Sequence, residues 1–438
     1  MEKQNTKGRE RMLSLFDAGT FVEMGAYIRR RGDKENEAYD AVLTGYGSVG
    51  GKLAFAFVQD SDKNAGALDS VGAEKISRLY EQAVKSGAPV IGVFDGAGAV
   101  VYDGASALAA YGKVMKCVSD ASGIIPQIAY VSGVCLGMAA TVAAMFDITV
   151  AVENVSELYV SAPAGNLDAN GMAAVYSETE ADAVATVRML VDLLPRNNKD
   201  VASVEPSDDV NRSVIGANGD VCPAYFADNL TVMNLYDGFG KEATTALARM
   251  GGETVGLISL KGRLTAKGAR KAAKLVSFCD SFSLPVVTLV DSEGVDTAAD
   301  AELAPALGKL AKAYITATTA KVTAVMGKAY GASFTLMGSR ALGADLALAT
   351  PESVISVMDP EAAVAFVWND KITTDKSRAE VEAEWKETYA SATIAAESGD
   401  IDDIVPAEEL RARIISALYM LAEKADGTPD RKHGVPTL

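Results

Sequence analysis

Near-continuous apolar runs alternate with amphipathic stretches through the N-terminal half of the chain. Residues 53–59 are apolar and rich in β-forming side chains, so they predict a buried strand. Apolar positions then recur at helical spacing from Ile76 onward, and Gly87 ends the predicted helix. Two further buried strands are predicted at 89–94 and 127–131. Strands of this kind that alternate with helices are typical of an α/β fold with a mostly parallel sheet, covered on both faces.

The second half of the chain repeats the first at a nearly fixed offset. Three pairs of segments match at offsets of 194 to 198 residues: 88–95 with 284–291, 126–133 with 320–327, and 146–151 with 344–349. Such self-similarity indicates two copies of one fold. A polar, turn-rich stretch at 195–213 lies between the copies. We therefore place the domain boundary near residue 215, which gives domains 1–215 and 216–438.

The composition narrows the chemistry. A length of 438 residues suits two domains of roughly 200 residues each. A formal net charge of -17 repels phosphate backbones, so we expect no nucleic-acid partner. The single histidine, His433, lies in the C-terminal tail, which argues against a Ser-His-Asp triad, a Cys-His pair and a histidine-rich metal site. Four scattered cysteines without C-x-x-C spacing fit a reducing cytoplasm and predict no bound metal.

One stretch, 123–146, carries no charge and is long enough to span a bilayer. Pro126, Gly133 and Gly137 interrupt it, so it is better interpreted as a buried strand, a tight glycine turn and a buried helix. Residues 1–11 are polar and charged, and they do not resemble a signal peptide. We therefore expect a cytoplasmic protein.

Six short segments occur in the order found in one known family. They lie at 8–23, 42–47, 73–76, 194–198, 328–332 and 431–434. Together they resemble the β-type carboxyltransferase subunit of biotin-dependent acyl-CoA carboxylases and decarboxylases. The resemblance covers nearly the whole chain. It implies two tandem crotonase-like domains built from ββα superhelical repeats, with the first domain on the acyl-CoA side and the second on the biotin side.

The resemblance also implies the chemistry. A carboxyl group passes between carboxybiotin and the α-carbon of an acyl-CoA, and the ureido nitrogen of biotin itself takes the α-proton. The protein then needs no acid or base of its own, but it must stabilise two oxyanions, on the thioester and on the ureido group. Backbone N–H groups that follow a strand and open a helix suit this task, so a chain without a usable histidine is compatible with it.

The resemblance places the thioester oxyanion at a glycine-rich turn in the first half. The expected donors are the amides of Gly137 and Met138, and Gly133 opens the same turn. A second donor is expected in the preceding loop, at Gly98 or Ala99. The Met138 side chain stands where the family has none, so it is expected to narrow the acyl pocket. The alternative is a glycine turn that only permits tight packing.

The matching turn in the second half is expected to hold the ureido oxyanion of biotin. It begins at Gly331, and the expected donors are the amides of Ala332 and Ser333. Gly294 and Val295 belong to the loop that faces this turn by the internal repeat. The alternatives here are a packing turn and a solvated surface loop.

Some positions depart from the family and leave other functions open. Val100 replaces an arginine, and Glu293 and Asp296 add two acids beside a site that must hold an anion. The alternatives are a non-catalytic scaffold homologue in a carboxylase assembly and an enoyl-CoA hydratase or isomerase. Hydration or isomerisation needs positioned carboxylates, and 123–146 contains none, which argues against that alternative.

The resemblance also implies partners. Lys116 is not flanked like a biotinyl lysine, so biotin is expected on a separate carrier protein, with a biotin carboxylase or a membrane decarboxylase subunit as a further partner. We expect a homo-oligomer, from dimer to hexamer, and a tail contact for His433. Cys135 and Cys279 are expected to be buried core thiols rather than nucleophiles.

Overall fold

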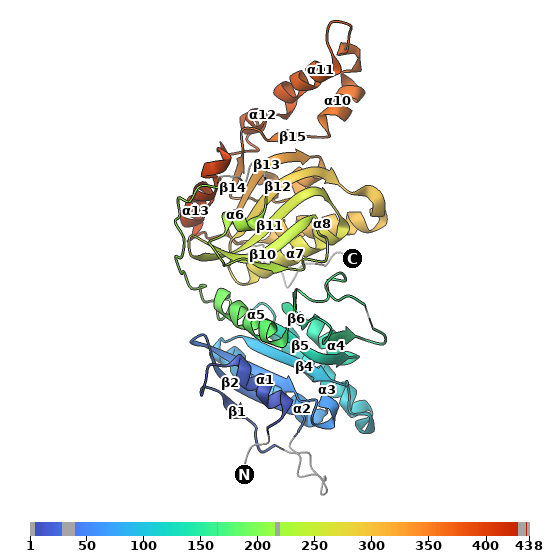
Figure 1. Ribbon diagram of the computed structural model, residues 1–438, viewed down its shortest axis with the longest axis vertical. Helices are drawn as coiled ribbons and strands as arrows, with labels where there is room; N and C mark the ends of the chain where they lie inside the picture. Colours follow the sequence, from blue (N-terminus) through green and yellow to red (C-terminus); the bar gives the residue numbers. More distant parts are fainter. Residues whose placement is uncertain (1–4, 29–39, 164, 215–219, 428–434, 436–438) are drawn as a thin grey trace. The chain divides into compact units, whose positions relative to one another are not determined.

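The computed structural model describes residues 5–28, 40–163, 165–214, 220–427 and 435. The chain divides into two compact units, Met1–Ser203 and Val204–Leu438. Within the described residues, each unit contains an eight-stranded mixed sheet with helices packed on it (Figure 1). The α/β class and the duplication predicted from the sequence are therefore confirmed.

The first sheet has the order β1-β2-β3-β4-β5-β6-β8, with β7 paired to the far end of β5. It is antiparallel from β1 to β3 and parallel from β3 to β8. The strands are β1 (Val22–Met24), β2 (Val42–Val49), β3 (Lys52–Gln59), β4 (Val90–Gly96), β5 (Gln127–Leu136), β6 (Ile148–Val152), β7 (Glu157–Tyr159) and β8 (Val175–Ser177). The helices are α1 (Lys7–Leu15), α2 (Ser70–Ser86), α3 (Ala105–Ala121), α4 (Met138–Ala144) and α5 (Glu180–Leu193).

The second sheet repeats this topology, with the order β16-β14-β13-β12-β11-β10-β9 and β15 paired to β13. Its strands are β9 (Met233–Leu235), β10 (Ala243–Met250), β11 (Glu253–Leu264), β12 (Val286–Val295), β13 (Lys321–Tyr330), β14 (Leu346–Ala349), β15 (Val354–Ser356) and β16 (Asp403–Ile404). Its helices are α6 (Pro223–Phe226), α7 (Ala266–Ser281), α8 (Asp300–Thr316), α9 (Ala332–Leu336), α10 (Pro360–Val367), α11 (Arg378–Trp385), α12 (Ala392–Glu397) and α13 (Leu410–Leu421).

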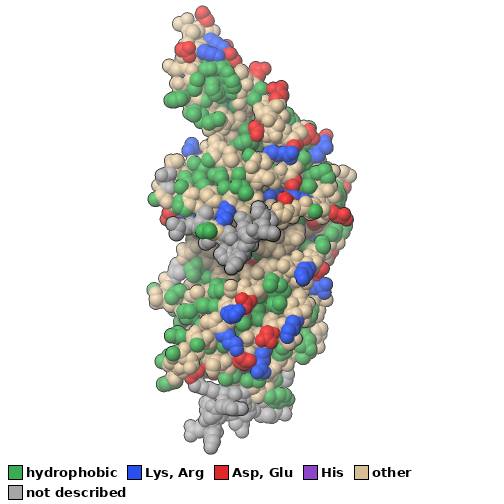
Figure 2. Space-filling model, turned by 180° about the vertical axis from the view of Figure 1, so that it is seen from behind, with side chains coloured by type: hydrophobic (Ala, Val, Ile, Leu, Met, Phe, Trp, Pro, Cys, Tyr) green, Lys and Arg blue, Asp and Glu red, His purple; other side chains and the backbone are tan. Residues whose placement is uncertain are grey.

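Helices α10 and α11 extend away from the second sheet as an arm (Figure 1). Trp368, Trp385 and Tyr389, which lie at or just after the C-terminal ends of these helices, pack against one another. Apolar side chains also gather on the outside of the arm (Figure 2), and Phe366 is among the exposed ones. The arm therefore has an aromatic cluster of its own.

Local signals explain why the elements begin and end where they do. Asp69 caps α2 by accepting the amides of Val71 and Gly72, and Gly87 ends the helix with φ 58°. In the first core, Phe57, Phe94 and Phe146 pack edge to face, with ring centroids 5.5–6.4 Å apart. The strands predicted at 53–59 and 89–94 and the helix between them are confirmed as β3, β4 and α2.

The uncharged stretch 123–146 forms β5, a turn at Gly137 and α4, as predicted. The strand is longer than the predicted 127–131, because its last residues pair with β7 after the pairing with β4 shifts register. In the described part of the chain, no helix is long and apolar enough to cross a membrane.

The boundary between the units lies after Ser203, earlier than the predicted residue 215. The residues that follow are polar, yet they bind the second unit. Glu205 accepts a hydrogen bond from Arg249 at 2.7 Å, and the Val214 amide donates to the Glu408 carbonyl. The composition of this stretch indicated a linker, but these contacts assign its second part to the following unit.

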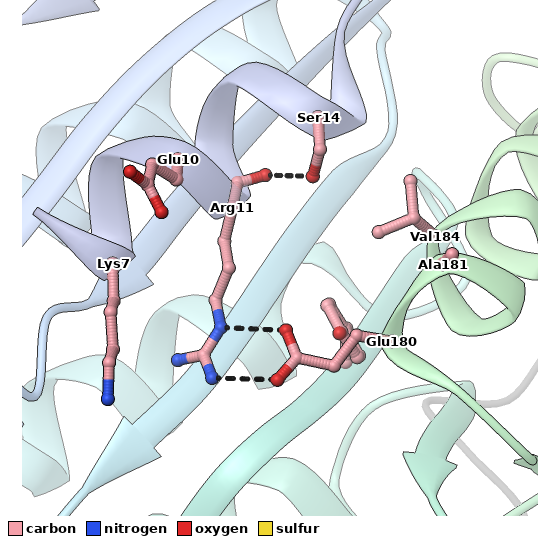
Figure 3. A pocket seen from close by; sticks show the side chains of 8 residues that line it. Lys7, Glu10, Arg11, Ser14, Glu180, Ala181 and Val184 are labelled. Carbon is pink, nitrogen blue, oxygen red and sulfur yellow. Dashed lines mark hydrogen bonds and ion pairs between the residues drawn. The ribbon is translucent and has the colours of Figure 1, made fainter.

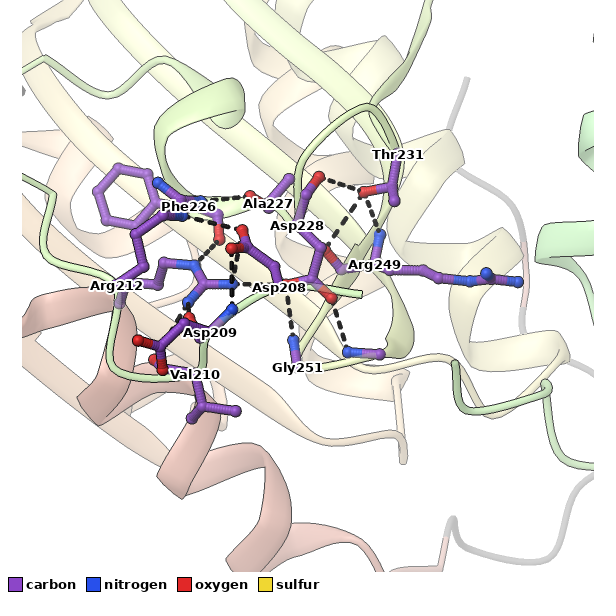
Figure 4. A network of polar contacts seen from close by, with 12 residues as sticks. Asp208, Asp209, Val210, Arg212, Phe226, Ala227, Asp228, Thr231, Arg249 and Gly251 are labelled. Carbon is purple, nitrogen blue, oxygen red and sulfur yellow. Dashed lines mark hydrogen bonds and ion pairs between the residues drawn. The ribbon is translucent and has the colours of Figure 1, made fainter. Parts of the chain in front are cut away.

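Each unit carries the same polar brace at a hairpin turn. Asp228 accepts the amides of Gly251 and Gly252 at 3.0 and 2.7 Å, between β10 and β11. Arg411 from α13 binds the same carboxylate, and both side chains are fully buried. Figure 4 shows the network around Asp228. The network thus attaches the turn between β10 and β11 to α13, the last helix of the second unit.

In the first unit, Asp17 takes the place of Asp228. It accepts the amides of Gly50 and Gly51 at 3.1 and 3.0 Å, between β2 and β3, and it pairs with Arg188 from α5 at 2.6 Å. This brace is about one-third exposed rather than buried. The two units thus share side-chain contacts as well as topology.

Candidate active site

Both units place a glycine turn between a long central strand and a short helix. Gly137 joins β5 to α4 with φ 59° and ψ -124°, and Gly331 joins β13 to α9 with φ 56° and ψ -134°. Side chains with a Cβ rarely adopt this backbone conformation. The turns predicted from the sequence therefore form, with nearly identical geometry in both units.

The amides of the two glycines are already engaged. Gly137 donates to the Tyr159 carbonyl at 3.0 Å, and Gly331 donates to the Ser356 carbonyl at 2.8 Å. This corrects the expectation that the Gly137 amide holds an oxyanion. The next amides, those of Met138 and Ala139, belong to the first helical turn, where N–H groups find no carbonyl inside the helix.

Ala332 and Ser333 occupy the same two places in the second unit. The residue directly after the glycine is exposed in both turns, as Met138 and as Ala332. The one after that is fully buried in both, as Ala139 and as Ser333. The structural match between the turns therefore assigns Met138 and Ala139, rather than Gly137 and Met138, as the counterparts of Ala332 and Ser333.

A loop faces each turn. In the first unit, Leu68 donates to the Gly98 carbonyl and accepts from the Val100 amide, in a parallel bridge centred on Ala99. Because neighbouring residues of an extended segment point their N–H groups to opposite sides, the Ala99 amide points away from Leu68. Val100, which stands where the family has an arginine, is buried. It therefore cannot make the contact that an exposed arginine would make at this position.

The second unit repeats this arrangement at the end of β12. Val295 pairs with Leu264, and the next amide, that of Asp296, donates to the Leu264 carbonyl. The Gly294 amide donates a hydrogen bond to the Ser292 hydroxyl oxygen at 3.2 Å. Val295 is therefore the counterpart of Ala99. Its amide points away from β11, so Val295 rather than Gly294 is the expected donor of this loop.

Loop and turn touch in each unit. A Cβ added at Gly98 would lie 3.6 Å from the Leu136 carbonyl oxygen, directly before the first turn. A Cβ added at Gly294 would lie 3.6 Å from the Tyr330 carbonyl oxygen, directly before the second. Each unit thus brings a loop amide and a turn amide to one place. We call these two places the first cradle (Ala99, Met138, Ala139) and the second cradle (Val295, Ala332, Ser333).

An aspartate supports each cradle from behind, buried in the case of Asp95 and partly exposed in the case of Asp291. Asp95 accepts the Val134 amide at 3.2 Å, and Asp291 accepts the Lys328 amide at 2.9 Å. A Cβ on Gly133 would overlap the Asp95 carboxylate, and one on Gly327 would overlap Asp291. Packing against the aspartate therefore accounts for the predicted site residue Gly133.

Only the first of these aspartates has an arginine beside it in the described contacts. Arg11 from α1 binds the Asp95 carboxylate and donates to the Ser132 carbonyl at 2.8 Å. It also pairs with Glu180 across a pocket between α1 and α5 (Figure 3). Burial lowers the pKa of Arg11, but the hydrogen bonds that Arg11 donates to Asp95 and Glu180 outweigh burial and raise it. Arg11 therefore stays charged and joins the two strand ends that lead into the first cradle.

The extra acids beside the second cradle have local partners. Glu293 pairs with Lys328 at 2.7 Å, and this hydrogen bond lowers the pKa of Glu293. Asp296 accepts the Ala298 amide at 3.0 Å. The expected conflict between these acids and a bound anion is reduced, because Lys328 offsets the charge of Glu293.

Residues considered as nucleophiles or attachment points have structural roles. Cys135 and Cys279 are buried, and burial raises the pKa of both thiols. Lys116 lies on the exposed side of α3, where it pairs with Asp120. Burial of the two thiols is confirmed, whereas the attachment of biotin to a separate carrier stays a prediction. His433 and the expected family segment 431–434 lie outside the described residues.

Comparison with known proteins decides the family. The family model described as the carboxyl transferase domain matches residues 3–168 and again 166–436. The chain belongs to the carboxyl transferase family. A carboxyl transferase relative, the methylmalonyl-CoA decarboxylase subunit alpha of Veillonella parvula, is 32% identical over 99% of this chain and 94% of its own length. The propionyl-CoA carboxylase carboxyltransferase subunit of Haloferax mediterranei is 31% identical, over 99% of this chain and 93% of its own.

The fold agrees with that assignment. A solved structure of transcarboxylase 12S, described as a hexamer with methylmalonyl-coenzyme A and methylmalonic acid bound, matches with a TM-score of 0.92 at 30% identity. The match covers 98% of this chain and 92% of that one. The chain is therefore an enzyme subunit of the biotin-dependent acyl-CoA carboxyltransferase class, as the sequence resemblance predicted.

Proposed function

We propose that this chain transfers a carboxyl group between biotin on a separate carrier protein and the α-carbon of an acyl-CoA, with the first cradle on the thioester and the second on biotin. The observation that carries the proposal is the duplication of one loop-and-turn site, because the reaction forms two oxyanions. Carboxybiotin, when bound, supplies carbon dioxide and a ureido nitrogen that accepts the α-proton. The net products are biotin and a carboxyacyl-CoA, or the reverse.

The first cradle stabilises the enolate of the thioester. The amides of Met138 and Ala99 donate to the thioester oxygen as its negative charge develops, and Arg11 and Asp95 keep loop and turn in place. Backbone donors that are already positioned lower the barrier without rearranging during the reaction. No side-chain acid or base is required, which fits the lack of a histidine among the described residues.

The second cradle stabilises negative charge on the ureido oxygen of biotin. The amides of Ala332 and Val295 are the donors. The Ala332 side chain is a single methyl group and exposed, so it leaves the turn open to a ring system. The pairing of Glu293 with Lys328 supports this assignment, because it reduces the negative charge beside the turn.

The two alternative functions are less well supported. A hydratase or isomerase would need a carboxylate free to move a proton. Asp95, which supports the first cradle, is buried and already binds Arg11, Ser61 and the Val134 amide. A scaffold could fill its cradles with its own side chains, whereas Met138 and Ala332 are both exposed.

The proposed function also implies an oligomeric state, partner proteins and a location in the cell. The transcarboxylase 12S structure is described by its hexamer assembly and as a multienzyme core. For this chain we propose a homo-oligomer, from dimer to hexamer. A biotin carrier protein completes the reaction, together with a biotin carboxylase or a membrane decarboxylase subunit. Four free cysteines support a reducing, cytoplasmic location.

Proline substitutions test the cradles directly. Proline removes the N–H group but is tolerated at the first position of a helix. Met138→Pro and Ala332→Pro should each lower the rate of carboxyl transfer between malonyl-CoA and biotin by about 100- to 1,000-fold, the usual cost of losing one oxyanion donor. The measurement is kcat for transfer of isotopic label.

Ser70→Pro is the matched control, because Ser70 opens α2, is exposed and lies in neither cradle. It should retain transfer activity. Full activity in Met138→Pro or Ala332→Pro would contradict the assignment of that turn. Circular dichroism of all three variants checks that the helices still form.

A further inference from the structure

The two cradles differ at one exposed position. Met138 follows the turn glycine in the first unit, and Ala332 follows it in the second. The preceding glycines share their backbone angles, and the following residues are both buried. At this exposed position the first cradle carries three more side-chain heavy atoms than the second, because methionine stands where the second unit has alanine.

The geometry of a helix start directs this side chain toward the bound oxyanion. In a helix, each Cα–Cβ bond tilts toward the N-terminus, the direction in which the first N–H groups also point. A thioester oxygen bound by the Met138 amide therefore lies beside the Met138 side chain. With 36% of its surface exposed, that side chain is not part of the hydrophobic core.

Other exposed apolar residues surround the first cradle. Val101 and Tyr102 directly follow its loop and are almost entirely exposed. Val160 is also exposed, and its carbonyl oxygen would lie 4.0 Å from a Cβ on Gly137. These three side chains are largely apolar, so a short alkyl group matches this rim.

We propose that Met138 sets the upper size limit of the acyl group, so that the enzyme acts on short-chain acyl-CoA esters of acetyl to propionyl size. The inference rests on the proposed function, because it places the thioester at the first cradle. Met138 occupies the space that a longer alkyl chain on the α-carbon would need. Replacement by alanine opens that space and leaves the backbone donor in place.

The test is a substrate series. Malonyl-, methylmalonyl-, ethylmalonyl- and butylmalonyl-CoA are offered as carboxyl donors, with free biotin as the acceptor, and kcat/KM is measured for each. In Met138→Ala, the ratio of kcat/KM for butylmalonyl-CoA to that for malonyl-CoA should rise by at least about tenfold, since even one methylene group in a hydrophobic pocket changes selectivity by about 10- to 200-fold. A partly misfolded variant would lose rate on every substrate without changing this ratio.

Two matched variants complete the test. Met138→Leu keeps the volume and should keep the wild-type ratio. Ala332→Met adds the same side chain to the second cradle, so it should raise KM for biotin and leave the acyl-CoA ratio unchanged. An unchanged ratio in Met138→Ala, or a shifted ratio in Ala332→Met, would overturn the inference.

Failure of the proposed function has a different outcome. If the wild-type chain transferred a carboxyl group from none of the four esters, the proposed function would be wrong and the size limit with it. Transfer by the wild-type chain with the same ratio in Met138→Ala would overturn the size limit alone.

Discussion

At the scale of single residues, Arg188 and Arg411 bind equivalent aspartates in different surroundings. The pair of Arg411 with Asp228 is fully buried, whereas the pair of Arg188 with Asp17 is about one-third exposed. A buried pair adds little over an apolar replacement, but removing one partner leaves a charge without compensation. An exposed pair is screened by water and contributes less.

Arg411→Ala should therefore be strongly destabilising. Loss of one partner of a buried pair costs about 3–5 kcal/mol, and Asp228 would lose the guanidinium that offsets its charge. Arg413→Ala is the control on the same helix, because Arg413 makes an exposed pair with Asp403. That variant should stay within about 0.5 kcal/mol of wild type. Urea unfolding measures both, and equal effects would contradict the difference in burial.

The Asp17–Arg188 pair of the first unit predicts that the stability of the fold depends on pH. The Arg188 hydrogen bond and the Gly51 amide hold the pKa of Asp17 well below its usual value. A carboxyl group with a lowered pKa in the folded state stabilises the fold above its unfolded pKa and loses that contribution as pH falls. Stability should therefore drop below about pH 4.

The variant Asp17→Asn should weaken this dependence. Thermal melting from pH 7 to pH 3 would show a smaller decrease in the variant than in the wild-type chain. Parallel curves for the two proteins would show that Asp17 does not contribute to the acid sensitivity.

At the scale of elements, the junction of β4 and β5 depends on a glycine without a positive φ angle. The Asp95 carboxylate fills the space where a Gly133 side chain would lie. Gly133→Ala should displace Asp95 and, through it, the loop and the turn of the first cradle. We expect a loss of stability together with a loss of carboxyl-transfer rate.

Gly112→Ala is the matched control. Gly112 lies within α3 with open space around its Cα, so alanine should stabilise the helix by about 0.5–1 kcal/mol and leave transfer intact. Denaturant titration and label transfer together test this pair. A Gly133→Ala variant as stable and active as wild type would contradict the supporting role of Asp95.

Most elements could be predicted because their apolar residues are contiguous or regularly spaced. The donor amides could not be assigned as well, because backbone hydrogen bonds leave no mark in the side-chain sequence. Gly137 was expected to donate to a ligand, but its amide pairs with Tyr159 at the end of β7, a strand of three residues. A signal was present in the repeat, since Met138 and Ala139 align with Ala332 and Ser333.

At the scale of the whole molecule, the sequence revealed the duplication only where equivalent residues of the two halves lie at a constant offset. The central strands recur at offsets near 196 residues, but Asp17 and Asp228 are 211 residues apart, and Arg188 and Arg411 are 223 apart. Differences in loop length between the units hid the repeated brace. The domain boundary was misplaced for a related reason, because polar residues after Ser203 bind the second unit through hydrogen bonds rather than apolar contacts.

Transfer of labelled carboxyl groups by the intact chain tests the central claim most directly. Purified protein is incubated with malonyl- or methylmalonyl-CoA labelled in the free carboxyl group, and with free or carrier-bound biotin. We predict that label moves to biotin and that omission of biotin abolishes the transfer. If the chain binds these esters but moves no label to biotin, the assignment of the two cradles to one carboxyl-transfer reaction is wrong.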